Sequence, residues 1–363
     1  MFDMHSELNT FFKEHVRLKP EKVEELDILR QRNIDRLNNG LKKLGYNGPV
    51  RTPAQGGRAM KTMNQRPENN PNTDHDIDTA TIFKREDLPE NPYDARQRVL
   101  AGIKEGGGNF SREPEARTNA VTVWYKNGYH VDLAVHRVYT DAYGYEVIEH
   151  AGVEWCRRDP AEITDWFNYR VELLSPTKSN GATVEAKQMR RIVQLLKYFS
   201  KTRSSWCLPG GLIISTLVSE KFVPNYYRDD KSLYETMQAI YHRLLVSIEV
   251  QNPVDPTYSL TYKDEYRNQV IQFRDKLCHA LDWLSPLFDA TCNREKAAGA
   301  WDKVFKHSFW KNIVAEEAKA RGETLEAAIL AGGLHTNPQG VLSTTKPSGK
   351  SVSNQPHRFF GKD

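Results

Sequence analysis

Three aspartates in two segments of the chain could carry metal-assisted chemistry. Asp76 and Asp78 are separated by one residue in the run DHDIDTATIF, which has the composition of a strand. Because side chains alternate along a strand, the two carboxylates would share one face of a sheet. Two carboxylates at this spacing can bind a pair of divalent cations about 3.5–4 Å apart. The pattern therefore predicts a metal site on that face.

Asp132 lies in a second strand pattern, VTVWYKNGYHVDLAVHRV. Its Asn127-Gly128 pair is a strong signal for a two-residue hairpin turn. In the returning strand, Val131 and Leu133 would face a core and Asp132 would face the opposite side. Asp is uncommon in strands. Asp132 therefore either faces water on a half-exposed sheet or is a third carboxylate beside the first two, where it would bind metal and help to deprotonate a ribose hydroxyl.

A glycine turn upstream of these strands could bind phosphate. Gly56-Gly57 is followed by helix-compatible residues, and backbone N–H groups at a helix N-terminus suit phosphate. Lys61 could add a positive charge. A Gly pair alone is usually only a turn. However, the DxD pattern follows about twenty residues later and a third Asp lies in a later strand. This order is typical of an enzyme that binds a triphosphate above a two-metal carboxylate floor.

A basic helical pattern, EAKQMRRIVQLLKYFSK, lies in the second half of the chain. Arg190, Gln194, Lys197 and Lys201 share one face at helical spacing. One interpretation is a solvated, charged surface. The other is that Lys197, with Arg190 or Lys201, faces a cleft and holds the β- and γ-phosphates of a nucleotide.

Hydrophobic periodicity divides the chain into two halves of different character. We expect an α/β half over residues 1–165, a mainly helical half over 166–331 and a disordered tail over 332–363, which is rich in Ser, Thr, Pro, Asn and Gly. In the first half, helices are expected over 22–44 and 93–104, and strands over 76–83 and 120–137. In the second half, helices are expected over 185–201, 232–248, 266–284, 295–314 and 325–330.

Composition narrows the class of protein. The 363 residues carry a formal net charge of +4, which is compatible with phosphate-bearing ligands but weak for a large nucleic-acid footprint. The four cysteines form no CxxC pair, so neither a zinc site nor a disulfide framework is indicated. This pattern favours a reduced, cytoplasmic protein. No apolar run approaches the length of a membrane span, so we expect no membrane association.

Together these motifs resemble the DNA polymerase β-like nucleotidyltransferase superfamily and, within it, the bacterial cGAS/DncV-like nucleotidyltransferases (CD-NTases). The resemblance covers roughly residues 35–220. It implies an α+β fold with two lobes, an N-terminal mixed sheet with helices and a mainly α-helical C-terminal lobe. The motifs that carry it are Gln55-Gly56-Gly57 with Met60 and Lys61, Asp76-Ile77-Asp78, His130-Val131-Asp132-Leu133, and the basic helix around Arg191 and Lys197.

The resemblance also implies a set of site residues. Asp76, Asp78 and Asp132 would be catalytic and would bind two Mg²⁺ or Mn²⁺ ions. The family usually carries Gly-Ser at the phosphate-binding turn, whereas this chain has Gly57 at the second position. The nucleotide would be bound by Gln55, Gly56, Gly57, Met60, Lys61, Arg190, Lys197 and Ser215.

The activity implied is synthesis of a cyclic dinucleotide or oligonucleotide second messenger from NTPs, with ATP and GTP as substrates. The setting implied is antiphage defence, in which a downstream effector binds the cyclic nucleotide. The tail contains Phe359-Phe360-Gly361, which a ubiquitin-transferase-like partner could conjugate to a target. Two alternatives remain: an RNA-tailing terminal nucleotidyltransferase and a non-catalytic nucleotide-binding scaffold. The weak net charge favours small nucleotides over RNA.

Overall fold

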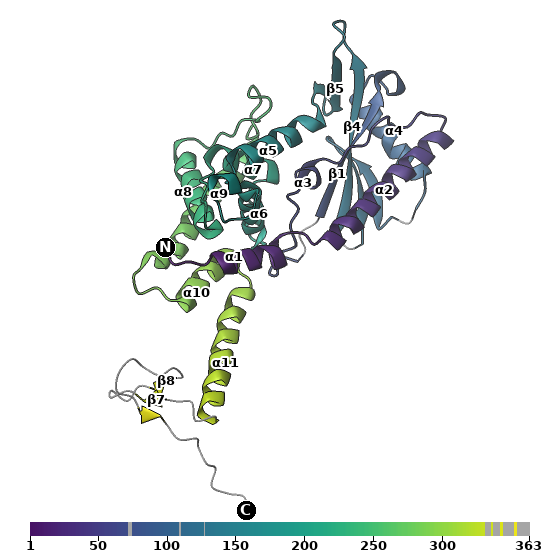
Figure 1. Ribbon diagram of the computed structural model, residues 1–363. Coiled ribbons are helices and arrows are strands. Elements are labelled where there is room, and N and C mark those ends of the chain that lie inside the picture. Colours follow the sequence, from purple (N-terminus) through teal and green to yellow (C-terminus); the bar gives the residue numbers. More distant parts are fainter. Residues whose placement is uncertain are drawn as a thin grey trace, which may run out of the picture.

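The computed structural model describes residues 1–71, 75–108, 110–126, 128–330, 335–336, 342–343 and 352–353. These residues form a lobe built on a sheet and a lobe built from helices, and a long helix extends from the helical lobe toward the C-terminus (Figure 1). The arrangement confirms the expected α+β fold with two lobes.

The sheet is mixed, and β4 is its central strand. Parallel pairing joins β4 to β1, while antiparallel pairing joins it to β3 and β5. The connected order is β2-β3-β4-β5-β6, with β1 on β4. The elements of this lobe are α2 (Pro20–Lys43), α3 (Gly56–Ala59), β1 (His75–Lys84), η2 (Arg85–Asp87), α4 (Pro92–Glu105), β2 (Arg112–Ala116), β3 (Val121–Tyr125), β4 (Tyr129–Thr140), β5 (Glu146–Ala151) and β6 (Trp155–Arg157).

Helices α2 and α4 cover one face of this sheet. Leu37 and Leu41 of α2 are fully buried in the same apolar cluster as Val131 and Leu133 of β4. The three- and four-residue spacing in α2 is what brings its apolar side chains onto one side. The opposite face of β1 carries Asp76 and Asp78 followed by Ala80 and Ile82, which are buried in a small apolar cluster with Ile148 of β5.

The helical lobe has its own core, and the N-terminal segment packs into it. Met4, Leu8 and Phe11 are fully buried in one cluster with residues of α6, α8 and α10. The segment therefore packs with the helical lobe, although the expected division places it in the α/β half over residues 1–165. The elements are α1 (His5–Phe11), the π-helical turn η1 (Phe12–Val16), α5 (Pro160–Leu174), η3 (Lys178–Asn180), α6 (Gln188–Lys201), α7 (Gly211–Lys221), α8 (Asp229–Val246), α9 (Asp264–Leu284), η4 (Ser285–Phe288), α10 (Arg294–Phe305) and α11 (Phe309–Leu330).

The single helix expected over 295–314 is wrong. The chain breaks after α10, where Lys306 adopts a left-handed conformation with φ of 48°, and α11 then runs on through the separate helix expected over 325–330. Apolar spacing continues across the break because Phe305 and Trp310 stack on Trp301 in the core. Sequence periodicity therefore did not reveal the break.

Little of the expected tail falls within the described residues. Three two-residue strands pair there: β7 (His335–Thr336), β8 (Leu342–Ser343) and β9 (Val352–Ser353). The proposed conjugation handle, Phe359-Phe360-Gly361, lies outside the described residues and stays a prediction. None of the helices in the described ranges combines the length and apolar character needed to span a bilayer.

Two buried histidines pair across β4 and β5. His136 and His150 are register partners with ring centroids 4.9 Å apart, and they are 1% and 4% exposed. Burial lowers the pKa of His136 to about 3 and that of His150 to about 4. Both are neutral in the folded protein, whereas the unfolded chain protonates them near pH 6.5. Above pH 6.5 the histidines are neutral in both states and do not affect the pH dependence of folding. As pH falls below 6.5, protonation of the unfolded chain lowers the free energy of unfolding.

Removing His136 should reduce the acid sensitivity of the fold. At pH 5 each buried, neutral histidine lowers stability by about 2 kcal/mol relative to pH 7.5. We expect His136→Phe to lose less stability than wild type over this interval in urea unfolding. His242, which is exposed on α8, provides the control, and His242→Phe should follow wild type. Equal pH dependence in all three proteins would contradict the prediction.

Candidate active site

The three aspartates lie on one face of two adjacent strands. In the parallel pairing of β1 with β4, Asp78 is the direct partner of Asp132, and Asp76 is the partner of His130. Ile77 and its neighbours on the opposite face are buried under α2 and α4. The predicted alternation and the placement of Asp132 beside the DxD pair are therefore confirmed. Antiparallel pairing of β3 with β4 also confirms the hairpin. The expected two-residue turn is wrong, because Tyr125 and Tyr129 are register partners and three residues lie between them; Asn127 itself lies outside the described residues.

Negative charge is concentrated at this face. The pKa of Asp78 is raised from 3.8 to about 6, first by burial and then by the charges of Asp76 and Asp132. Electrostatic interactions with His130 and Lys197 act in the opposite direction but do not cancel the effect. The ionised cluster is therefore one that a cation would stabilise.

Two residues that sequence reasoning did not include among the site residues contact the carboxylates. The Nε2 atom of His130 lies 3.2 Å from Oδ1 of Asp76 and 3.6 Å from Oδ2 of Asp132. The hydroxyl of Thr122, on β3, donates a hydrogen bond of 2.6 Å to Oδ1 of Asp132. Alternation along the strand already predicts that His130 shares a face with Asp132, and extending the argument across the hairpin could have placed Thr122 there too.

The glycine turn packs directly against the aspartates. The backbone N–H of Gln55 donates to the carbonyl of Asp78 at 2.8 Å. Gly56, the first residue of α3, has φ of +55°, and a Cβ built on it would lie 2.0 Å from Oδ2 of Asp78. Only glycine fits this conformation and this approach. The turn and the carboxylates thus form one contiguous site.

Lys197 reaches the turn from the helical lobe. Its Nζ donates to the carbonyl oxygen of Thr62 at 2.8 Å and to the Thr62 hydroxyl at 3.1 Å. A Cβ on Gly57 would lie 3.6 Å from that Nζ. Of the two interpretations of the basic helix, this position disfavours a solvated surface for Lys197, because its amine lies against the glycine turn.

The pKa of Lys197 is lowered from 10.5 to about 8, first by burial and then by the charge of Lys201. The amine is therefore cationic below pH 8 and loses its charge above it. We expect affinity for a non-hydrolysable ATP analogue to weaken above pH 8, approaching tenfold per pH unit. The Lys197→Met variant should bind the analogue more weakly at pH 7, and its affinity should not fall further as the pH rises above 8. The exposed Lys221 supplies the control, because Lys221→Met should keep the wild-type pH dependence. A fall in affinity above pH 8 that persists in Lys197→Met would contradict the assignment of this pH dependence to Lys197.

Three other predicted nucleotide ligands have packing or hydrogen-bond partners other than the three aspartates. Met60 is 4% exposed and packs in the core of the helical lobe. The Ser215 hydroxyl is fully buried and donates to the carbonyl oxygen of Gly211, one turn earlier in α7. Arg190 is also buried, and its guanidinium donates to Oδ1 of Asn168 on α5. For these residues a role in nucleotide binding stays a prediction, because their present contacts are structural.

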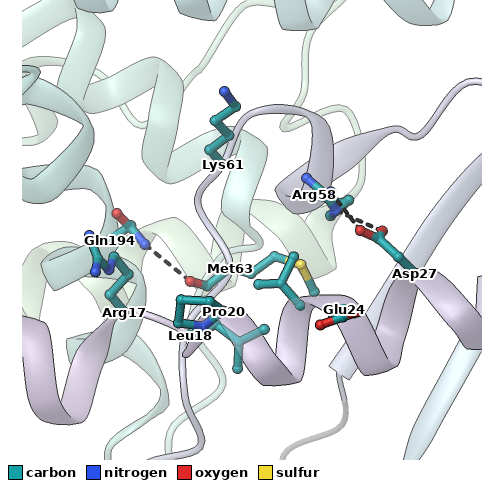
Figure 2. Close-up of a pocket in the computed structure, with 10 residues that line it drawn as sticks. Arg17, Leu18, Pro20, Glu24, Asp27, Arg58, Lys61, Met63 and Gln194 are labelled. Carbon is teal, nitrogen blue, oxygen red and sulfur yellow. Dashed lines mark hydrogen bonds and ion pairs between the residues drawn. The ribbon is translucent and has the colours of Figure 1, made fainter.

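Lys61 lines a pocket of about 410 Å³ next to the turn, and the three aspartates do not line it. Figure 2 shows Arg58 paired with Asp27 of α2 on one side of this pocket and Gln194 of α6 bonded to the carbonyl of Met63 on the other. The segment that follows Gly56-Gly57 is therefore held by both lobes. This bracing fixes the position of the glycine turn relative to β1.

The donor set suits a hard divalent cation. Carboxylate oxygens are the ligands that Mg²⁺ and Mn²⁺ prefer. Burial and then repulsion by Asp76 and Asp132 raise the pKa of Asp78, and such a cation would relieve the repulsion. Within the described ranges no three His, Cys, Asp or Glu side chains meet the geometry of a formed metal site. The aspartates thus provide the donors but not a finished coordination shell.

Comparison with known proteins agrees with this geometry. The family described as "Cyclic GMP-AMP synthase DncV-like, nucleotidyltransferase domain" matches residues 50–136, which include the glycine turn and all three aspartates. The fold resembles the cyclic AMP-GMP synthase DncV of Vibrio cholerae, with 16% identity, a TM-score of 0.62 and coverage of 84% of this chain and 96% of that chain.

Two further structures share the fold. CdnC of E. coli MS115-1, solved with ATP, has 18% identity and a TM-score of 0.58 over 84% of this chain and 98% of that chain. The CD-NTase CdnG of Bradyrhizobium diazoefficiens, solved with GTP, has 16% identity and a TM-score of 0.56 over 83% and 95%.

Residues 50–136 thus match a nucleotidyltransferase domain, and the chain as a whole shares the fold of these structures. Both the matched domain and the similar structures point to the bacterial cGAS/DncV-like nucleotidyltransferases as the proteins that this chain resembles.

Proposed function

We propose that this enzyme joins NTPs, with ATP and GTP as substrates, into a cyclic dinucleotide or oligonucleotide. The observation that carries the proposal is the contiguity of Asp76, Asp78 and Asp132 with the Gly56 turn and Lys197. Carboxylates on one side and phosphate-binding groups on the other are what transfer of a nucleotidyl group requires.

Each group has a role that follows from its place. In this proposal the Gly56-Gly57 turn and Lys197 bind the donor triphosphate, and Asp132 helps to deprotonate the acceptor ribose hydroxyl. Two divalent ions held by the three aspartates would stabilise the pyrophosphate leaving group and lower the pKa of that hydroxyl. The lobes orient donor and acceptor for in-line attack. A linear dinucleotide that turned over in the cleft would then close in a second transfer.

The relatives support a nucleotide substrate and a stepwise reaction. DncV of V. cholerae has been solved with the linear intermediate 5′ pppA(3′,5′)pG, CdnC with ATP and CdnG with GTP. We extend this chemistry to the present chain because its carboxylates and glycine turn fall in the matched domain.

The RNA-tailing alternative needs the same three carboxylates, so the site alone does not separate it from cyclisation. Net charge is the feature that favours small nucleotides, since +4 over 363 residues provides little attraction for a polyanion. The scaffold alternative is disfavoured by the cost of keeping three carboxylates together without a catalytic use.

One assay separates the three functions. Purified protein is incubated with ATP, GTP, CTP and UTP and with Mg²⁺ or Mn²⁺, then treated with phosphatase, and the products are identified by mass spectrometry. We expect a phosphatase-resistant cyclic species that requires the divalent ion. Ladders formed only with added RNA would instead establish a tailing enzyme. A protein that binds NTPs but forms no product with either ion would fit a scaffold.

The biological part of the proposal is that the product signals during phage infection. A downstream effector that binds the cyclic nucleotide would read the signal, and the enzyme would act in the cytoplasm. Accumulation of the product in infected cells, and its absence from uninfected cells, is the measurement that checks this role.

A further inference from the structure

The two oxygens of the Asp132 carboxylate have different neighbours. Oδ1 accepts the 2.6 Å hydrogen bond from the Thr122 hydroxyl. Oδ2 lies on the side of His130, whose Nε2 is 3.6 Å away and also contacts Asp76. The side chain of Asp132 keeps 25% of its surface exposed, so it is free to rotate unless something fixes it. The Thr122 contact is the candidate restraint.

Thr122 is suited to that task. It is the cross-strand register partner of Asp132 in the antiparallel β3–β4 pair and is 1% exposed. A carboxylate can only accept, so the hydroxyl must donate. A short hydrogen bond to a charged acceptor is stronger than a neutral one. Branching at Cβ also limits the rotamers of Thr122, which aims its hydroxyl at one point.

We propose that Thr122 is a positioning residue that holds Oδ1 of Asp132 and thereby leaves Oδ2 directed toward the space shared with Asp76 and Asp78. This inference rests on the proposed function, because it concerns how Asp132 meets a divalent ion. Loss of the hydroxyl leaves the carboxylate present but unfixed. Outer partners of metal-binding side chains typically change metal affinity or activity by 10–100-fold.

A second buried threonine offers a matched control. Thr81 on β1 is fully buried and also uses its hydroxyl once, donating to the carbonyl oxygen of Ala134 at 3.1 Å. Thr81→Val and Thr122→Val therefore remove one buried hydroxyl each from the same sheet. Only the second change touches Asp132. If the role of Thr122 were purely structural, the two variants should not differ in Mn²⁺ binding.

The test is titration of the metal-free full-length chain with Mn²⁺ alone, followed by electron paramagnetic resonance of the free ion. We expect Thr122→Val to weaken Mn²⁺ binding about tenfold. Thr122→Ser, which keeps the hydroxyl, should stay close to wild type, and so should Thr81→Val. In turnover, Thr122→Val should lower kcat with little change in KM for NTPs, while its thermal unfolding matches that of Thr81→Val.

Asp132→Asn separates failure of the inference from failure of the proposed function. Mn²⁺ binding that depends on Asp132 but is equal in Thr122→Val and Thr81→Val would overturn the positioning role and leave the proposed function intact. Mn²⁺ binding that is unaffected by Asp132→Asn would overturn the assignment of the metal site itself.

Discussion

Asp78→Asn is expected to abolish product formation and, at the same time, to make the folded protein more stable than wild type. The activity is lost because one of the three carboxylates that would bind the ions is gone. The stability rises because the raised pKa of Asp78 shows that its ionised form is unfavourable in the fold. For such a group, stability is highest at low pH and is lost as pH rises from 3.8 through about 6.

At pH 8 the ionised Asp78 lowers stability by about 2–3 kcal/mol, and the neutral amide of Asn removes that penalty. We expect a rise of a few degrees in Tm for Asp78→Asn without divalent ions, measured beside the NTP assay. Asp165→Asn, at an exposed position on α5, removes the same charge far from the cluster and should leave both readouts unchanged. A variant that is inactive but less stable than wild type would show that Asp78 supports the fold rather than straining it.

The acidic face could be predicted from sequence because strand periodicity alone determines it. Asp76 and Asp78 must share a face once the run is a strand, and the hairpin signal sets which side Asp132 takes. Their juxtaposition required a further fact that no local pattern contains, namely that β1 pairs with β4 in parallel and in register. From sequence, the place of Asp132 beside the first two aspartates is therefore only one of two interpretations.

Contacts between the lobes could not be predicted in the same way. The face of α6 that carries Lys197 also carries Arg190, and helical spacing treats the two alike. In the structure only Lys197 reaches the glycine turn, through Thr62, whereas Arg190 is turned onto α5. The difference depends on how two lobes with separate cores meet, which is a long-range property.

The break between α10 and α11 was hidden for a related reason. A helix usually ends where glycine or proline interrupts the apolar pattern, and here Lys306 takes the left-handed conformation. The stacked rings of Trp301, Phe305 and Trp310 stabilise the turn from the core side. Tertiary packing thus overrode the local signal.

Alanine should be damaging at the first glycine of the turn and tolerated at the second. At Gly56 the added Cβ would meet Oδ2 of Asp78 at 2.0 Å, and φ of +55° disfavours any residue with a side chain. At Gly57 the Cβ would lie 3.5 Å from Met63 and 3.6 Å from Lys197, which are ordinary contacts. The added methyl group therefore displaces the turn at position 56 but fits within it at position 57.

Gly56→Ala is expected to reduce product formation about 100-fold, because a shift of about 1 Å between phosphate-binding groups and carboxylates can cost that much. The shift follows from the geometry, since relieving the clash moves α3 away from β1 and weakens the 2.8 Å hydrogen bond from Gln55 to Asp78. Gly57→Ala should retain activity within a few-fold, and Gly57→Ser should do the same while adding a hydroxyl near Lys197. Rates and Tm are measured for all three variants. If Gly56→Ala and Gly57→Ala were equally active, the turn would not be seated against the carboxylates during the reaction, and triphosphate binding would have to be assigned to other groups.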